Sequence, residues 1–404
     1  MLVSTILYRT YKVIVTFASM VIFIQGAISI LVYQALINAF YSKNLSTRQK
    51  LMDLTKKRFI LLLVTILSLV APSHVRITTD NESIPKGTIY MDHHKGRLIS
   101  KANSNAVVIA NHQIYTDWVF LWWLAYVSER AGNVYIMLKK SLESIPLLGS
   151  GMTNYKFIFM NRKWEQDRIN LSNKLHEIDL DARGVGIIAG NSPTTKTEEG
   201  LNIWDEAKVE KKGEQWPYWL MLFPEGTNLS AGTRARNKAF AEKSGLSPFK
   251  HVLLPRTTGL KFCLQKLRNS CEYVYDITIA YSGVRAEDYG QDIYKLGNIF
   301  LKGKAPKLVD IYIRAIRLDD IPLEDDDEFH SWLFSVWNLK DKLLDNYYKT
   351  GSFQLDPDLN HAVTGPCRVS ILSLVSILLF PVLTMLPIFY YIGKKATSLV
   401  SKDS

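Results

Sequence analysis

Cysteine is scarce in this chain of 404 residues, and the few cysteines form no pattern. Cys263, Cys271 and Cys367 show no short paired spacing and have no histidine nearby. Neither a disulfide framework nor a zinc module is supported, and a reducing, cytosol-facing environment fits the polar part of the chain. No two histidines have the spacing of a helical metal motif, so we expect no metal site.

The sequence also lacks patterns that define other classes of protein. It has no heptad or internal repeat, no basic stripe interleaved with aromatic residues and no G-x-S-x-G turn. These absences argue against a coiled coil, a nucleic-acid partner and a serine hydrolase of the common α/β type. What is present is 47% hydrophobic residues beside 22% charged ones, with a net charge of +11. This mixture predicts membrane segments joined to a polar domain that favours anionic partners.

Residues 1–73 are predicted to form an N-terminal membrane anchor. Residues 13–35 carry no charge and reach the roughly 20 residues that a bilayer core requires. A signal peptide is the alternative, although its apolar core usually has only about 7–15 residues. We expect the basic segment 43–58 at the cytosolic headgroups. The apolar run 59–71 is too short to span, so it should enter one leaflet or pair with the first helix.

Residues 366–404 are predicted to form a C-terminal membrane segment with a basic tail. The uncharged stretch 369–392 is long enough to span a bilayer, but Pro381 and Pro387 interrupt it. Proline removes a backbone donor and kinks or breaks a helix. A simple span and a re-entrant hairpin therefore both stay open.

The region between the anchors, 74–365, reads as one α/β domain with a mostly parallel sheet. Short β-like runs alternate with helix-like segments, a pattern typical of that class. The stretch 191–215 is polar and broken by proline and glycine, which predicts a surface insertion. The predicted strands are 106–110, 185–189, 219–223 and 274–280.

The first candidate site follows the run 106–110, at a predicted strand end. His112 and Asp117 are five residues apart, which on a continuous helix would place them about 140° around the axis. With His112 on a turn and Asp117 in the first helical turn, the carboxylate can instead reach and orient the imidazole, as in a general base with its orienting acid. The alternative is that Asp117 only caps the helix and His112 is an incidental turn residue.

A second turn comes directly after the run 219–223. Pro224, Glu225, Gly226 and Thr227 make a tight turn whose backbone N–H groups and hydroxyl can receive an anion, because glycine permits close approach. A charged glutamate facing a phosphate would be unfavourable, so we expect Glu225 to bind a substrate hydroxyl or to shape the turn.

Four motifs in order resemble those of the membrane-bound glycerolipid acyltransferases of the lysophosphatidic acid acyltransferase type. The first is Asn111-His112 with Asp117, the second is 157–162 ending in Arg162, the third is Pro224-Glu225-Gly226-Thr227, and the fourth is 253–259 with Pro255 and Arg256. Four matches in sequence are far more specific than one. The residues in and around these motifs are more similar to those of the lysocardiolipin and lysophosphatidylinositol acyltransferase branch. One departure is Asn228, where many members of the family have an arginine.

The resemblance implies a glycerolipid-acyltransferase-like fold and direct acyl transfer from acyl-CoA to a hydroxyl of a lysophospholipid, with acyl-CoA as co-substrate and no cofactor. It implies catalytic roles for His112 and Asp117. The substrate-binding residues that it implies are Asn111, Arg162, Glu225, Gly226, Thr227, Pro255 and Arg256.

Phosphatidylinositol remodelling at the endoplasmic reticulum membrane, with the active site facing the cytosol, is the expected function. Phosphatidic acid synthesis by acylation of lysophosphatidic acid is the alternative, with cardiolipin remodelling third, and a lipid droplet or mitochondrial membrane also stays open. A rival from another class is a non-catalytic lipid-binding or scaffold protein, against which the intact His112 and Asp117 speak. The sequence identifies no protein partner.

Overall fold

A mixed but mostly parallel sheet organises the protein, whose computed structural model describes residues 2–146, 148–161, 163–209 and 212–400. The strand order is β12-β1-β11-β10-β4-β9-β5-β6, and only the β1–β12 and β10–β11 pairs are antiparallel. The predicted α/β class is therefore confirmed. The strands are β1 (His74–Asp80), β4 (Ala106–Ala110), β5 (Val134–Lys139), β6 (Ile158–Met160), β9 (Trp219–Leu222), β10 (Tyr273–Tyr281), β11 (Leu308–Arg317) and β12 (Asn360–Pro366).

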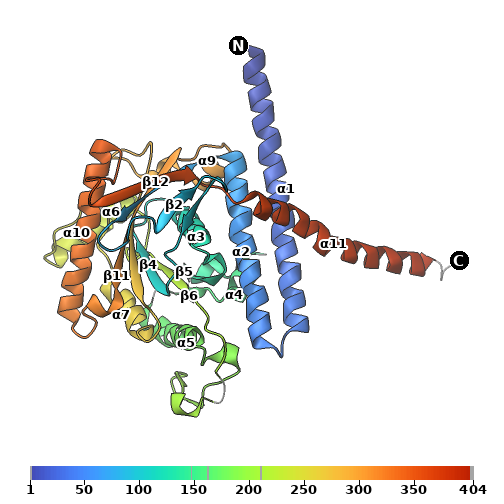
Figure 1. Ribbon diagram of the computed structural model, residues 1–404, viewed down its shortest axis with the longest axis horizontal. Helices are drawn as coiled ribbons and strands as arrows, with labels where there is room; N and C mark the ends of the chain where they lie inside the picture. The colour runs from blue at the N-terminus through green and yellow to red at the C-terminus, as the bar shows by residue number, and fades with distance from the viewer. Residues whose placement is uncertain (1, 147, 162, 210–211, 401–404) are drawn as a thin grey trace.

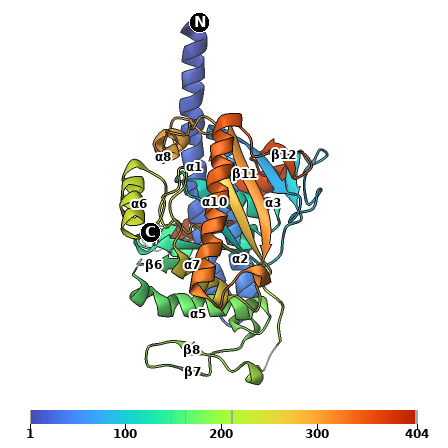
Figure 2. The same cartoon turned by 90° about the vertical axis from the view of Figure 1, so that its left-hand side faces the viewer.

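Helices cover both faces of this sheet (Figures 1 and 2). One apolar core joins the sheet to α2 (Leu45–Val70) and α3 (Asp117–Val127). A second joins it to α5 (Trp164–Ala182), α7 (Thr257–Lys266) and α10 (Asp326–Thr350). Burial on both sides explains why β4 is a continuous apolar run without alternation, and all five of its residues are fully buried.

The remaining elements lie at the edges of this layered core. The described part of the predicted insertion 191–215 projects from the domain and carries the hairpin of β7 and β8 (Figure 2). The predicted strand 185–189 is wrong: a 3-10 helix, Ile187–Ala189, lies there, closed by Gly190 in the left-handed region. These smaller elements are β2 (Ile89–Asp92), β3 (Arg97–Ser100), α4 (Leu148–Asn154), β7 (Thr195–Lys196), β8 (Asn202–Ile203), α6 (Ala231–Lys243), α8 (Gly290–Ile293) and α9 (Leu296–Phe300).

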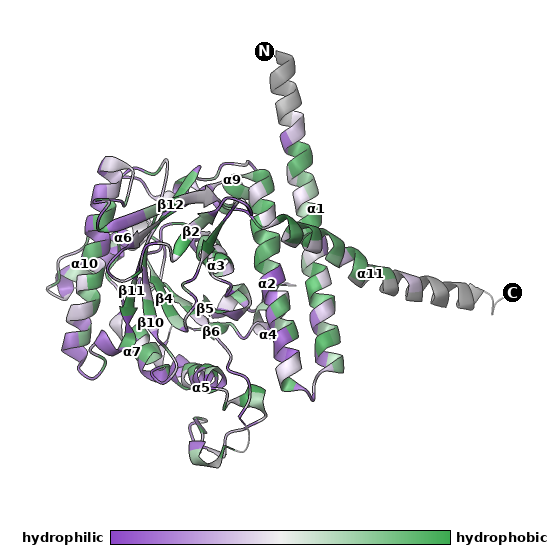
Figure 3. Ribbon diagram, in the orientation of Figure 1, coloured by the Kyte–Doolittle hydropathy of each residue, from purple (hydrophilic) through white to green (hydrophobic). Residues whose placement is uncertain are grey.

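Two long helices form the N-terminal region. Helix α1 (Leu2–Phe40) contains a segment, Thr10–Phe40, that is long and apolar enough to cross a membrane, and it stands clear of the domain at its N-terminal end (Figures 1 and 3). Helix α2 runs unbroken through both the basic segment and the apolar run that follows it. Of the two fates expected for residues 59–71, pairing with the first helix is the observed one, because α2 packs against α1 and buries Ile60–Leu67 in the domain core.

Two basic residues of α2 contact the protein, although the basic segment was expected at the headgroups. Lys56 is fully buried instead of lying at a headgroup surface: it pairs with Asp53, and its ammonium group lies 4.4 Å from the centre of the Tyr135 ring. Arg58 donates to Ser376 of α11 (Ile371–Val400) and lies over the Phe380 ring at 4.1 Å. These two charges therefore bind α2 to the protein.

Helix α11 leaves the domain beside α1 and extends away from it (Figure 1). Its backbone continues through both prolines, so no hairpin forms among the described residues of this segment. The described apolar part, Ile371–Leu383, is shorter than the roughly 20 residues of a span. The C-terminal membrane segment stays a prediction.

Candidate active site

The carboxyl ends of three neighbouring strands meet at one edge of the sheet. Strands β9, β4 and β10 are mutually parallel in this order, so the loops that follow them leave from the same edge. Parallel α/β sheets place ligands at this edge. The loop after β4 carries His112, and the loop after β9 carries Glu225.

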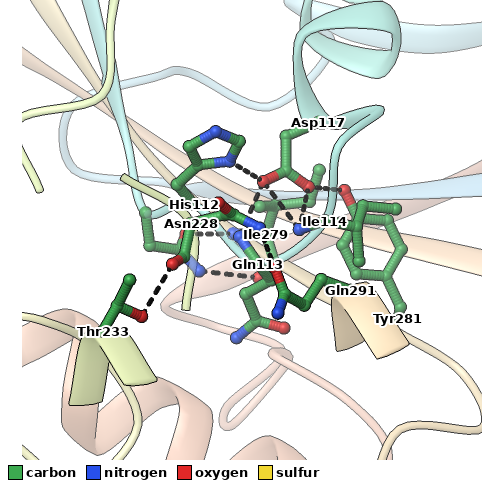
Figure 4. Close-up of polar contacts among 10 residues, drawn as sticks. His112, Gln113, Ile114, Asp117, Asn228, Thr233, Ile279, Tyr281 and Gln291 are labelled. Carbon is green, nitrogen blue, oxygen red and sulfur yellow. Dashed lines mark hydrogen bonds and ion pairs between the residues drawn. The ribbon is translucent and has the colours of Figure 1, made fainter. Parts of the chain in front are cut away.

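His112 and Asp117 meet as the spacing predicts. His112 lies on the turn after β4, and Asp117 is the first residue of α3. The distance between His112 Nδ1 and Asp117 Oδ2 is 2.7 Å (Figure 4). The alternative in which Asp117 only caps the helix is thus incomplete, because the same carboxylate also holds the imidazole.

Asp117 is fully buried and is surrounded by donors. The backbone N–H groups of Gln113 and Ile114 donate to Oδ2 at 2.7 and 3.1 Å, and the Tyr281 hydroxyl at the end of β10 donates to Oδ1. Burial and the neighbouring Asp117 raise the pKa of Tyr281 well above its usual value, so the phenol stays a donor. Sequence inspection missed Tyr281, since it lies 164 residues from Asp117 and carries no local signal.

The imidazole of His112 contacts Phe223 through its ring face, in addition to its hydrogen bond to Asp117. Phe223 stacks on the ring with centroids 4.4 Å apart, and the His112 side chain keeps 19% of its surface exposed. In the tautomer in which Nδ1 donates to the carboxylate, Nε2 carries the lone pair, and Nε2 points away from Asp117 (Figure 4). This is the geometry of a general base that is open to substrate on one side.

Asn111 has a role different from the predicted one. Its side-chain amide donates to the Ile279 carbonyl at 3.0 Å, its oxygen accepts the Ile279 N–H at 2.8 Å, and the residue is fully buried. With no exposed surface, this side chain is out of reach of a substrate. The prediction of substrate contact is corrected: Asn111 ties the end of β4 to β10 and so sets the position of the next residue, His112.

The third and fourth motifs form one structure beside the base. The Arg256 N–H donates to the Pro224 carbonyl at 2.9 Å, which joins the two turns. Gly226 has φ = +71°, and a Cβ there would lie 3.1 Å from Arg256 Nε. Glycine therefore suits the left-handed turn, and a side chain in its place would push the guanidinium group of Arg256 aside. Arg256 is exposed, and Pro255 beside it is buried.

Glu225 is buried between these turns and α10. Neither of its carboxyl oxygens has a hydrogen-bond partner at normal distance among the described residues, and the N–H groups of Leu253 and His112 and the Trp337 indole are among the polar groups near it. Burial raises the pKa of Glu225 to about 8. The raised pKa favours the neutral carboxyl near pH 7, which suits a buried group that shapes the turn.

Two predicted residues remain. Thr227 is half-buried in the turn. Arg162 lies outside the described residues. The aromatic side chains of α3, among them Trp122 and Trp123, are buried in the core. Among the described residues, no group of acidic, histidine or cysteine side chains could hold a metal ion.

The fold and this site define an acyltransferase, and comparisons with known proteins agree. A family model described as "Acyltransferase" matches residues 76–282, and another described as "Acyltransferase C-terminus" matches 299–378. The chain belongs to the acyltransferase family.

Similar proteins of this family include three with named acceptors. The chain is 53% identical over 390 residues to a 2-acyl-1-lysophosphatidylinositol acyltransferase of Saccharomyces cerevisiae, covering 96% of this chain and 98% of that protein. It is 31% identical to lysocardiolipin acyltransferase 1 of Gallus gallus, covering 71% and 66%. It is 30% identical to lysophosphatidylinositol acyltransferase 10 of Caenorhabditis elegans, covering 61% and 53%.

Proposed function

We propose that this protein transfers a fatty acyl group from acyl-CoA to the free sn-1 hydroxyl of a 2-acyl lysophosphatidylinositol, as a step of phosphatidylinositol remodelling. The observation that carries the proposal is the His112–Asp117 pair, held at 2.7 Å with one ring nitrogen open to the site. The acceptor and the position of its hydroxyl follow from the relative that is 53% identical over nearly the whole chain.

The reaction requires one base and no covalent intermediate. His112 Nε2 takes the proton of the acceptor hydroxyl as its oxygen attacks the thioester carbonyl. A C–O bond forms, the C–S bond breaks, and the imidazolium returns the proton to the departing thiolate. Asp117 keeps the imidazole in the required tautomer and stabilises its charge while the proton is held.

The binding half of the site suits two anionic substrates. The exposed Arg256 guanidinium can meet a phosphate group in a bidentate manner, and the buried, neutral Glu225 adds no negative charge beside it. The acceptor lies in a bilayer, and the apolar α1 supports a membrane location. The endoplasmic reticulum is the proposed membrane on the resemblance to the family alone. The cytosolic side is proposed for the active site because the buried cysteines are free and suit a reducing compartment.

The test is acyl transfer from labelled acyl-CoA to lysophospholipids with inositol, phosphate, glycerol, choline and cardiolipin headgroups. Wild type and His112→Ala are purified in detergent and compared at equal amounts, with His93→Ala, on an exposed turn, as the matched control. We expect the inositol acceptor to be preferred and its transfer to be lost only in His112→Ala. Preference for lysophosphatidic acid would overturn the proposed identity of the acceptor. Full activity in His112→Ala would overturn the proposed role of His112 as the base. No transfer by folded wild type would favour a lipid-binding protein.

A further inference from the structure

Two neutral amide side chains meet beside the catalytic histidine. Asn228 follows the Pro224–Thr227 turn, and Gln291 lies on α8, in the segment after β10. The Asn228 Nδ2 group donates to Gln291 Oε1, and both residues are half-buried (Figure 4). The pair therefore joins the loop after β9 to the segment after β10 at the same edge of the sheet that holds His112.

The backbone around Asn228 is fixed against the catalytic loop. The Asn228 carbonyl accepts from Thr233 Oγ1 at 2.9 Å, within the capping box that begins α6. The next N–H group, that of Leu229, donates to the His112 carbonyl at 2.8 Å. Asn228 is thus placed by the same loop that places the base.

Helix α8 is fixed from the other side. A Cβ added to Gly290 would lie 2.9 Å from Ile114 Cγ2, so α8 packs directly on the catalytic loop. The Tyr294 N–H donates to the Gly290 carbonyl at 2.8 Å and closes the turn that carries Gln291. Both amides are therefore held on backbone that contacts the His112 loop.

The hydrogen bond within the pair leaves one acceptor and one donor for a ligand. Asn228 Oδ1 and Gln291 Nε2 have no hydrogen-bond partner among the described residues. Neither atom is among the buried side-chain atoms that lack a partner. A carbonyl oxygen next to an N–H donor matches two neighbouring hydroxyl groups, one donating and the other accepting. A phosphate monoester offers only acceptor oxygens and would face the Asn228 carbonyl unfavourably.

We propose that Asn228 and Gln291 form a subsite for the polyhydroxyl headgroup of the acceptor, binding two adjacent hydroxyls of the inositol ring. The proposal rests on the proposed function and names the residues that select its substrate. Gly226 lies on the same β9–α6 connection as Asn228, and Arg256 lies against it. Arg256 then contacts the phosphodiester, while the amide pair binds the ring beyond it. A site built to bond hydroxyls discriminates strongly against a ligand that lacks them.

The test uses substitutions that keep side-chain shape and remove hydrogen bonding, Asn228→Leu and Gln291→Met. Acceptors are lysophosphatidylinositol, lysophosphatidylglycerol and lysophosphatidic acid in detergent micelles, with the full chain and saturating acyl-CoA. The control is Gln265→Met, an exposed amide on α7 that bonds the Leu323 carbonyl. Thermal unfolding is measured for every variant.

We expect kcat/KM for lysophosphatidylinositol to fall about tenfold in each variant, mainly through KM, while that for lysophosphatidic acid stays within about twofold. An equal fall for both acceptors would show a structural role and overturn the subsite. So would an unchanged inositol-to-phosphate ratio. If wild type ignores lysophosphatidylinositol but accepts lysophosphatidylglycerol, the proposed function fails while the ratio for the glycerol headgroup still decides the subsite. A wild type with no preference for either polyol overturns both.

Discussion

The two halves of the active site are built in opposite ways. Around Asp117 the protein supplies partners for the carboxylate from the His112 ring, the catalytic-loop backbone and Tyr281. Around the Pro224–Thr227 turn the polar side chains are held less tightly: Glu225 is buried without a normal hydrogen bond, and Arg256 is exposed. The first half is complete within the protein, and we propose that substrate completes the second.

From this difference we expect the first half to govern the rate and the second to govern substrate affinity. A base works best when its orientation is fixed before substrate arrives, since no reorganisation is then needed during the reaction. Groups that bind substrate gain most when their partners are missing in the free protein. Substitutions in the first half should therefore lower kcat, and those in the second should raise KM or change stability.

The largest effect is expected for Asp117→Asn. The amide can donate to His112 Nδ1, which moves the ring proton to Nε2 and removes the lone pair that accepts the substrate proton. We expect kcat to fall about 10³-fold with KM changed less than about threefold. Steady-state kinetics on protein whose thermal unfolding matches wild type checks this. A loss confined to KM would break the assignment of this half to rate.

Glu225→Gln should act on stability through pH. The pKa of Glu225 is raised from 4.5 in the unfolded chain to about 8 in the folded protein. Its protonated form is therefore favoured on folding, and the stability that it contributes is lost as pH rises from about 4.5 to about 8. Glutamine does not titrate and therefore does not show this loss. The free energy of unfolding of the variant should exceed that of wild type by roughly 2–4 kcal/mol above about pH 8 and by little near pH 5.

The measurement is thermal unfolding of both proteins in one detergent at about pH 5, pH 7 and pH 9. Glu324→Gln, an exposed carboxyl in a surface ion pair, is the control and should show no such trend. A constant difference between Glu225→Gln and wild type at all three values would contradict the neutral, buried carboxyl.

Gly226→Ala and Arg256→Ala test the binding half together. In Gly226→Ala the added methyl group strains the left-handed turn. It also lies 3.1 Å from Arg256 Nε and so pushes the guanidinium group aside. Each change should raise KM for the lysophospholipid about tenfold with kcat nearly unchanged, and the double variant should be far from additive. Arg268→Ala, which breaks a surface ion pair, should leave KM unaltered. Full additivity would mean that Gly226 acts without Arg256.

Tyr281→Phe should have the smallest effect of the series. It removes one donor to Asp117 but leaves the two backbone donors and the imidazole in place. We expect kcat to fall about threefold to tenfold and stability to drop by about 1 kcal/mol. Kinetics and thermal unfolding on the same preparation check both values. A loss as large as that of Asp117→Asn would place Tyr281 at the reacting atoms instead.

Short-range patterns predicted much of this protein. An apolar run, a turn and an acidic residue at a helix start predicted how His112 and Asp117 meet, because chain geometry over a few residues decides it. The same logic failed for 185–189, where flanking glycines allow a turn instead of a strand. Asn111 looked like a binding residue in its motif, but its role depends on Ile279, 168 residues away.

The sequence by itself therefore determined the α/β class, the meeting of His112 with Asp117 and an apolar N-terminal helix. Only the tertiary structure decided that the second apolar run is core, that the Asn111 side chain bonds β10, that Tyr281 reaches Asp117 and that Gln291 meets Asn228. The reason is physical: burial of apolar surface is non-directional, so lipid and protein satisfy the same run of residues equally well. Likewise, a hydrogen bond between distant strands depends on how the sheet is assembled, and no local pattern carries that information.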